Sequence, residues 1–373
     1  MSSLTERSLE FDPFAGFVLG MAVGDALGLP REGLSRRRAA KMYGVAPLGH
    51  RLVFGRGMVS DDTEHMRMTA QALLAESANP ARFARCLAWK LRWWMAGLPA
   101  GTGMATAKSI VRLWLGWSPE RSGVRSAGNG PAMRAGVLGL CLHRDGEPLR
   151  EFVRVATRMT HVDPRAEMGA LLIALGAREA VRANGSPINS KTFLQLCREQ
   201  PLDEEWRRTL AVVELSLATG ESATEFATRL GLDRGIRGYI VSTVAAVLFC
   251  WLRWPGEFRR PVEEIIQLGG DTDTTAAILG GLAGTTCGAE AIPQEWLQRL
   301  IEWPYSVTWM RTVLSTELGL RFGVTGTSTA ARQPGVPVAP TPRCINWLAV
   351  PGRNLVFLAI VLTHGLRRLL PPY

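Results

Sequence analysis

Residues 15–28 read AGFVLGMAVGDALG, and this stretch decides the fold because its glycines recur at every fourth position. Residues four apart lie one above another on a helix, so these glycines share one face and let a second backbone approach closely. They are Gly16, Gly20, Gly24 and Gly28. A helix pair in lipid is disfavoured, because the apolar run is short and Asp25 interrupts it. Close packing in a soluble helical core is predicted instead.

Helical periodicity continues through the rest of the chain, and few runs alternate as strands do. Apolar residues recur at helical spacing in 82–95, 131–142, 166–181, 206–217, 236–252 and 276–283. Glycine and proline separate these segments. The pattern predicts an all-α domain of about a dozen helices around one core, ending near residue 324.

Composition bounds the class of protein. The chain has 373 residues, 47% apolar and 20% charged, which suffices for one large domain or two smaller ones. Its net charge is +10, and part of the excess lies between Arg31 and Lys41, where an anionic ligand or a solvated basic face is expected. Six cysteines lack compact zinc spacing and indicate reduced thiols of a cytoplasmic protein.

The carboxyl end differs in composition. A Pro/Gly-rich linker is predicted at 325–344, followed by a short apolar and basic tail at 345–373. The run INWLAVPGRNLVFLAIVL, 345–362, is expected to break between Pro351 and Asn354, which leaves a segment too short to span a bilayer. No transmembrane segment is therefore predicted. A docked terminal helix is favoured over a membrane-surface anchor.

An acidic pair stands in GGDTDTTAAILGG, residues 269–281, ahead of a predicted helix. An EF-hand loop beginning at Asp271 fails, since Ala276 and Leu282 occupy its sixth and twelfth positions. No GxxxxGK[ST] phosphate loop occurs in the chain. Asp271 or Asp273 could cap the helix, but a cap needs only one acid.

The same pattern occurs in GMVSDDTEHMRMTAQALL, residues 57–74, where a serine and two acids precede a helix. Carboxylate and hydroxyl oxygens suit Mg²⁺ or Mn²⁺, whereas zinc or iron would favour clustered His and Cys. Each pair alone is more often a helix cap in a solvated turn. If the fold joins them, their four carboxylates suffice for two cations sharing a nucleophilic water.

Two further stretches have features of a ligand site. RSAGNGPAMRAG, 125–136, is a glycine-rich turn entering a helix, where backbone N–H groups could hold a phosphate. MTHVDPRAEMGA, 159–170, places His161 just before a helix. Taken singly, an ordinary helix entry and a structural histidine are the simpler interpretations.

Together with GDALGLPREG at 24–33, these four stretches resemble the ADP-ribosylglycohydrolase family in order and spacing, over roughly residues 12–310. The resemblance implies a single orthogonal multi-helix domain with a central two-metal cleft holding Mg²⁺ or Mn²⁺. It also implies hydrolysis of the bond between the anomeric ribose carbon of ADP-ribose and an acceptor, often a protein side chain.

The resemblance also implies roles for individual residues. The implied metal ligands are Ser60, Asp61, Asp62, Asp271, Asp273 and Thr274. Glu32 and Asp61 are the implied catalytic residues that move the proton. The implied substrate-binding residues are Ser126, Gly128, Asn129, Gly130 and His161.

The acceptor is less well defined. Some relatives that cleave ADP-ribosyl-arginine carry an aspartate before GNG, where this chain has Ser126 and Ala127. Arginine is the first expectation, with serine-linked or O-acetyl-ADP-ribose as the alternative. A catalytically silent member is disfavoured, because the acids are present.

Other expectations concern partners and packing. A monomer is expected. Nucleic-acid binding is not expected, because the basic residues are spread along the chain and four tryptophans are predicted to pack in the core. These are Trp93, Trp94, Trp114 and Trp117. Glu64 and His65, which match no motif, are expected on the surface.

Overall fold

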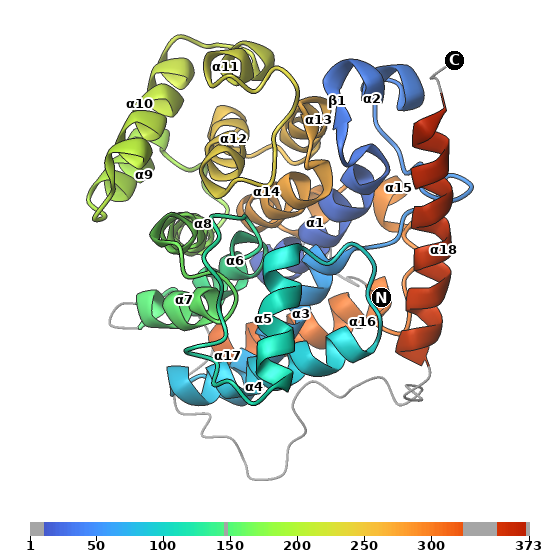
Figure 1. Ribbon diagram of the computed structural model, residues 1–373. Helices are drawn as coiled ribbons and strands as arrows, with labels where there is room; N and C mark the ends of the chain where they lie inside the picture. The colour runs from blue at the N-terminus through green and yellow to red at the C-terminus, as the bar shows by residue number, and fades with distance from the viewer. Residues whose placement is uncertain (1–10, 145–147, 324–348, 371–373) are drawn as a thin grey trace, which may run out of the picture.

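The computed structural model describes residues 11–144, 148–323 and 349–370, and it is almost entirely helical (Figure 1). The predicted linker, 325–344, lies outside these ranges. The longer helices are α1 Pro13–Gly28, α3 Asp61–Ala75, α4 Pro80–Ala96, α5 Met104–Trp114, α6 Ala132–Cys141, α7 Leu149–Arg158, α8 Pro164–Ala183, α10 Glu204–Ala218, α12 Ile240–Arg253, α14 Thr272–Cys287 and α18 Ala349–Leu369. The shorter elements are η1 Leu29–Arg31, α2 Arg36–Tyr43, α9 Ser190–Arg198, α11 Ala223–Arg229, α13 Arg259–Gln267, η2 Ala289–Ala291, α15 Gln294–Leu297, α16 Val307–Trp309, the π-helical turn η3 Met310–Ser315 and α17 Thr316–Phe322. The predicted all-α class is confirmed.

The glycine face of α1 packs directly against α14. A Cβ added at Gly24 would lie 1.9 Å from the carbonyl oxygen of Ala276, and one at Gly16 would lie 2.0 Å from that of Gly284. Gly20 and Gly280 meet in the same way. Any side chain at these positions would force the two backbones apart, so the predicted close packing is confirmed.

The α1–α14 pair forms the centre of the core, and the other long helices surround it (Figure 1). Helices α8, α12 and α13 pack on α14, while α6 lies between α8 and α3. The helices predicted from periodicity are present, each within a few residues of its expected bounds. One continuous apolar core joins them.

A two-residue antiparallel ladder is the only sheet among the described residues. It pairs β1, Leu34–Ser35, with β2, Gly269–Gly270. Gly270 has φ +86°, and a Cβ there would lie 1.9 Å from the carbonyl oxygen of Ile236. The ladder joins the segment after Glu32 to the start of the second acidic pair, so two distant motifs are held together by backbone.

The carboxyl tail forms one unbroken helix, so the predicted break between Pro351 and Asn354 is wrong. Pro351 stands in the first turn of α18, where a backbone N–H has no intrahelical partner to lose. Within the described part of the chain, two helices are long and apolar enough to cross a membrane, which also corrects the expectation that the tail segment is too short. Pro13–Arg31 is 94% buried as a core helix, whereas Ala349–Leu369 is only 17% buried.

Some predicted positions differ from those observed. Of the four tryptophans expected in the core, only Trp94 is buried, while Trp93 and Trp114 stack edge to face on the surface and Trp117 is also exposed. Arg31 is buried rather than solvated and donates to the carbonyl of Tyr43. The cysteines in the described ranges are free, as predicted, and Cys344 lies outside them.

Candidate functional site

A cavity of about 380 Å³ collects nearly all the residues that the sequence analysis singled out. The predicted residues that line it are Glu32, Ser60, Asp61, Ser126, Gly128, Asn129, Gly130, His161, Asp271, Asp273 and Thr274. Asp62 is buried behind this wall and reaches the cavity through Thr274. Motifs from five separate parts of the chain therefore meet at one place.

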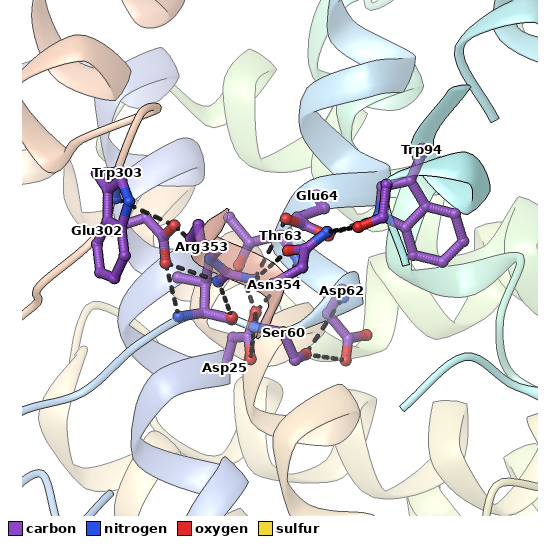
Figure 2. A network of polar contacts seen from close by, with 12 residues as sticks. Asp25, Ser60, Asp62, Thr63, Glu64, Trp94, Glu302, Trp303, Arg353 and Asn354 are labelled. Atoms are coloured by element: carbon purple, nitrogen blue, oxygen red, sulfur yellow. Dashed lines mark hydrogen bonds and ion pairs between the residues drawn. The ribbon is translucent and has the colours of Figure 1, made fainter. Parts of the chain in front are cut away.

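Asp25, on the glycine-faced helix, organises the first acidic pair (Figure 2). Its carboxylate accepts hydrogen bonds from the backbone N–H of Ser60 at 2.9 and 3.0 Å, and from the N–H and hydroxyl of Thr63 at 3.2 and 2.5 Å. Ser60 is the N-cap of α3, and its hydroxyl accepts from the N–H of Asp62. Asp25 thus fixes the turn that presents Asp61 to the cavity.

The two acidic pairs are in direct contact. The hydroxyls of Thr274 and Ser60 donate to Asp62 Oδ2 at 3.1 and 3.2 Å, and Asn129 donates to Asp271 Oδ2 at 2.7 Å. Asp271 stands at the N-cap of α14, but its side chain makes no capping bond, so the simple cap interpretation does not explain it. The Oδ1 atoms of Asp62 and Asp273 are buried without a hydrogen-bond partner.

Burial and mutual repulsion raise the pKa of these carboxyl groups. The pKa of Asp61, Asp62 and Asp273 lies well above its usual value, first because of burial and then because of the neighbouring acids. Glu32 behaves alike: burial and the charge of Asp271 raise its pKa, while Arg368 opposes the shift. Such a cluster gains stability from a positive charge among its oxygens.

His161 is held by a chain of hydrogen bonds from the core. The buried guanidinium of Arg134 donates to the Thr160 hydroxyl, which lies 2.9 Å from His161 Nδ1. The Thr160 hydroxyl also lies 3.4 Å from the carbonyl oxygen of Thr157, and its contact with Nδ1 fixes the orientation of the imidazole ring. Burial, and then Arg134, lowers the pKa of His161 to about 3, which keeps the ring neutral.

The glycines of the GNG turn sit against this histidine. A Cβ at Gly128 would lie 3.1 Å from His161 Nε2, and one at Gly130 would lie 3.2 Å from Cε1. The backbone N–H of Asn129 donates to the carbonyl of Gly238, which fixes the turn against the segment before α12. The small residues thus leave room for a ligand beside His161.

Three groups of cavity residues were missed by the sequence analysis. The loop Gly101–Gly103 and the first turn of α5 line the cavity, as do Phe357 and Val361 from α18. The glycine-rich PAGTG at 99–103 was interpreted only as a helix stop, although glycines before a helix start also suit a ligand. Nothing in the tail's composition indicated that it reaches the site.

Glu64 and His65 are not surface residues, contrary to expectation. Glu64 accepts from Trp94 Nε1 at 2.6 Å and lies 3.5 Å from Arg353 of α18. Arg353 also donates to Glu302 and to the carbonyl of Val59, just before the first acidic pair (Figure 2). His65 is buried against Arg134 and the Trp94 ring, so the lack of a matching motif did not mean a surface position.

Comparison with known proteins agrees with this geometry. A sequence model described as ADP-ribosylglycohydrolase matches residues 6–325. The chain belongs to the ADP-ribosylglycohydrolase family. It is therefore a glycosidic-bond hydrolase that acts on ADP-ribose linkages, in a family that generally uses divalent metal ions.

Individual relatives of this ADP-ribosylglycohydrolase differ in their names. The ADP-ribosyl-[dinitrogen reductase] glycohydrolase of Rhodospirillum rubrum is 27% identical, over 78% of this chain and 90% of its own. The ADP-ribosylhydrolase ARH3 of Bos taurus is 28% identical, over 48% of this chain and 54% of its own. A solved ADP-ribosylglycohydrolase-related protein complex has a TM-score of 0.62 at 29% identity, covering 84% of this chain and 98% of that one.

The family match ends near residue 325, so α18 lies beyond it. Helix α18, which lines one side of the cavity of this ADP-ribosylglycohydrolase, therefore lies outside the residues that the family model matches. Across residues 11–144, 148–323 and 349–370, no three His, Cys, Asp or Glu side chains converge tightly enough to hold an ion by themselves. The unpartnered Oδ1 atoms of Asp62 and Asp273, and the hydroxyls beside them, do fit a hard cation.

Proposed function

We propose that this enzyme removes ADP-ribose from arginine side chains of proteins, using two Mg²⁺ or Mn²⁺ ions. The observation that carries the proposal is the single cavity shared by both acidic pairs, Glu32, the GNG turn and His161. A cytoplasmic location and a monomeric state belong to the same proposal.

The cations would be held by the carboxylates of Asp61, Asp62, Asp271 and Asp273 and by the hydroxyls of Ser60 and Thr274. When bound, they supply positive charge that polarises the ribose oxygens and acidifies water. The chain itself supplies the orphaned Oδ1 atoms and the hydrogen bonds from Ser60, Thr274 and Asn129 that orient the carboxylates.

Glu32 or Asp61 moves the proton in this proposal. A water oxygen forms a bond to the anomeric carbon while the bond from that carbon to the acceptor breaks. The carboxylate takes the proton from the water and passes it to the leaving acceptor nitrogen. A raised pKa brings Glu32 closer to neutral pH, where such an acid–base group works best.

The remaining polar residues would bind the ADP-ribose. The His161 ring lines the cavity, and Gly130 of the GNG turn and the first turn of α5 offer backbone N–H groups suited to phosphate oxygens. No lysine or arginine lines the cavity among the described residues, whereas four carboxylates do. A guanidinium acceptor therefore has better electrostatic complementarity than an anionic one.

The alternative acceptor is a serine side chain or an O-acetyl group. The observation that favours it is the absence of an aspartate before GNG. Ser126 stands there, and its hydroxyl accepts from the N–H of Gly128 at 3.2 Å. An ester or ether oxygen would need no carboxylate partner.

One assay tests the proposal. Purified protein is incubated with arginine-linked and serine-linked ADP-ribosyl peptides and with O-acetyl-ADP-ribose, with Mg²⁺, Mn²⁺ or a chelator, and released ADP-ribose is quantified by chromatography. Chelator-sensitive release from the arginine peptide is expected, and Asp273→Ala should abolish it. Asp233→Ala, on the surface, is the matched control. Release only from the serine peptide would move the assignment to the alternative, and release from none would indicate a silent member.

A further inference from the structure

Helix α18 has an outward face that lacks the charges expected of a helix in water. Leu355, Leu362, Leu366 and Leu369 are 57%, 59%, 67% and 81% exposed. Val356 and Leu358 are also 46% and 36% exposed. Among the exposed positions of α18, only Arg367 carries a charge. A helix on a soluble domain normally turns its charged side outward, so this face indicates a non-aqueous contact.

The segment beside α18 carries only positive charge. Residues 33–60 contain no aspartate or glutamate, and neither do residues 349–370. The two segments touch: Arg38 donates to the carbonyl of Leu370 at 3.1 Å, and His364 Nε2 lies 2.5 Å from the carbonyl oxygen of Leu52. The basic residues of the first segment are Arg36, Arg37, Arg38, Lys41, Arg51 and Arg56.

An exposed aromatic ring lies among these basic residues. Phe54 is fully exposed at the tip of a tight turn closed between Val53 and Arg56, and its φ is +46°. A bulky residue in the left-handed region at a turn tip gains nothing from the protein interior. Aromatic rings flanked by arginines are common where a protein meets the headgroups of a bilayer.

We propose that the outward face of α18, with Phe54 and the surrounding basic residues, binds the surface of an anionic lipid bilayer. The helix would lie in the plane of the headgroups, with its leucines entering the acyl boundary, and with Arg367 and exposed basic residues such as Arg37 and Lys41 meeting lipid phosphates. Figure 1 shows α18 along one edge of the molecule, where no other element covers its outer side. Such a position allows contact with a flat surface.

Two other occupants fit less well. A second copy of the chain would bring two positively charged faces together, and like charges oppose that contact. A membrane-spanning α18 would have to leave its dock, which would strip Glu302 and Glu64 of Arg353 and leave Arg353 and Asn354 in hydrocarbon. Surface binding keeps these inward contacts intact.

Vesicle flotation of the full chain tests the proposal. Vesicles of phosphatidylcholine with phosphatidylglycerol should carry the protein upward, and phosphatidylcholine vesicles should not. Combining Leu358→Glu, Leu362→Glu and Leu366→Glu should weaken binding by roughly tenfold or more. Leu320→Glu, at a position 70% exposed on α17, is the matched control and should bind like wild type. Arg37→Ala and Lys41→Ala should each weaken binding about fivefold and reduce its salt sensitivity.

Several outcomes would overturn the proposal. Equal binding to neutral vesicles would show that electrostatic attraction does not contribute to binding. Undiminished binding of the triple variant would show that α18 does not contact the bilayer. Resistance to alkaline carbonate extraction would favour a spanning helix. A dimer in light scattering that the triple variant loses, without vesicle binding by wild type, would favour self-association. Circular dichroism and thermal unfolding establish that each variant is folded, independently of enzymatic activity.

Discussion

The carboxylate of Asp25 accepts hydrogen bonds from the backbone N–H of Ser60 at 2.9 and 3.0 Å, across the boundary between α1 and α3. Asp25→Ala would leave that N–H and both donors of Thr63 unsatisfied in the core, so the free energy of unfolding should fall by about 3 kcal/mol. Mg²⁺ affinity, measured by calorimetry, should fall with it. Asp12→Ala, which removes only the N-cap of α1, should cost about 1 kcal/mol and leave Mg²⁺ affinity unchanged.

Gly24→Ala tests the contact between the central helices. The new Cβ would lie 1.9 Å from a backbone carbonyl oxygen that cannot move by itself, so a loss of about 3 kcal/mol or more is expected in urea unfolding. Gly365→Ala is the matched control, because nothing lies within 4 Å of a Cβ there and α18 should gain about 1 kcal/mol. Equal stability of the two variants would contradict the packing argument.

Thr160→Val should uncouple His161 from Arg134. The ring would lose its hydrogen-bond partner at Nδ1, which holds its orientation, so KM should rise roughly tenfold while kcat changes little. Thr160→Ser restores the hydroxyl and should recover the wild-type KM. A purely structural role would instead lower the unfolding temperature and leave KM alone.

Because His161 is neutral in the folded protein, lowering the pH should lower the free energy of unfolding. The pKa of His161 is about 3 in the folded state and near 6.5 in the unfolded chain, because burial and then Arg134 disfavour the charged ring. Below pH 6.5 the unfolded chain therefore binds the extra proton, and stability falls as pH falls toward 3. His161→Asn lacks this effect, so its free energy of unfolding relative to wild type should improve by about 2 kcal/mol between pH 7.5 and 5. A constant difference across that range would contradict it.

Phe357 of α18 should act as part of the cavity wall. Phe357→Leu removes ring contacts without unpairing a polar group, so kcat/KM for a peptide substrate should fall roughly fivefold, mainly through KM. Leu358→Ala, one residue further on the outer side, should leave the kinetics unchanged. Identical kinetics of the two variants would show that α18 does not contact substrate.

The sequence was most informative where one local pattern serves one purpose. Four glycines at fixed spacing predicted a close helix contact, and the repeated acid–hydroxyl pattern before two helices indicated a site for two cations if the fold joined the two segments. Both follow from short-range rules of helix geometry and carboxylate solvation. The helix periodicity likewise predicted the all-α class.

The failures arose where tertiary contacts decide the outcome. His65 and Glu64 occupy polar positions on a helix, but α3 is surrounded on most sides, so polar residues there are buried with partners such as Arg134 and Arg353. Pro351 did not interrupt α18, because its position in the first turn is visible only once the start of the helix is known. The role of α18 in the cavity depends on docking across the whole chain, which no local pattern encodes.

Because of the α1–α14 contact, the geometry of the site does not depend on how tightly the surrounding apolar core is packed. Asp25 stands on one of these helices and Asp273 on the other, and backbone atoms rather than side chains set the spacing between the two axes. Substitutions in the surrounding apolar core can therefore lower the free energy of unfolding while the two aspartates keep their relative positions. The glycines at the α1–α14 contact are therefore the positions at which a substitution would shift Asp25 relative to Asp273.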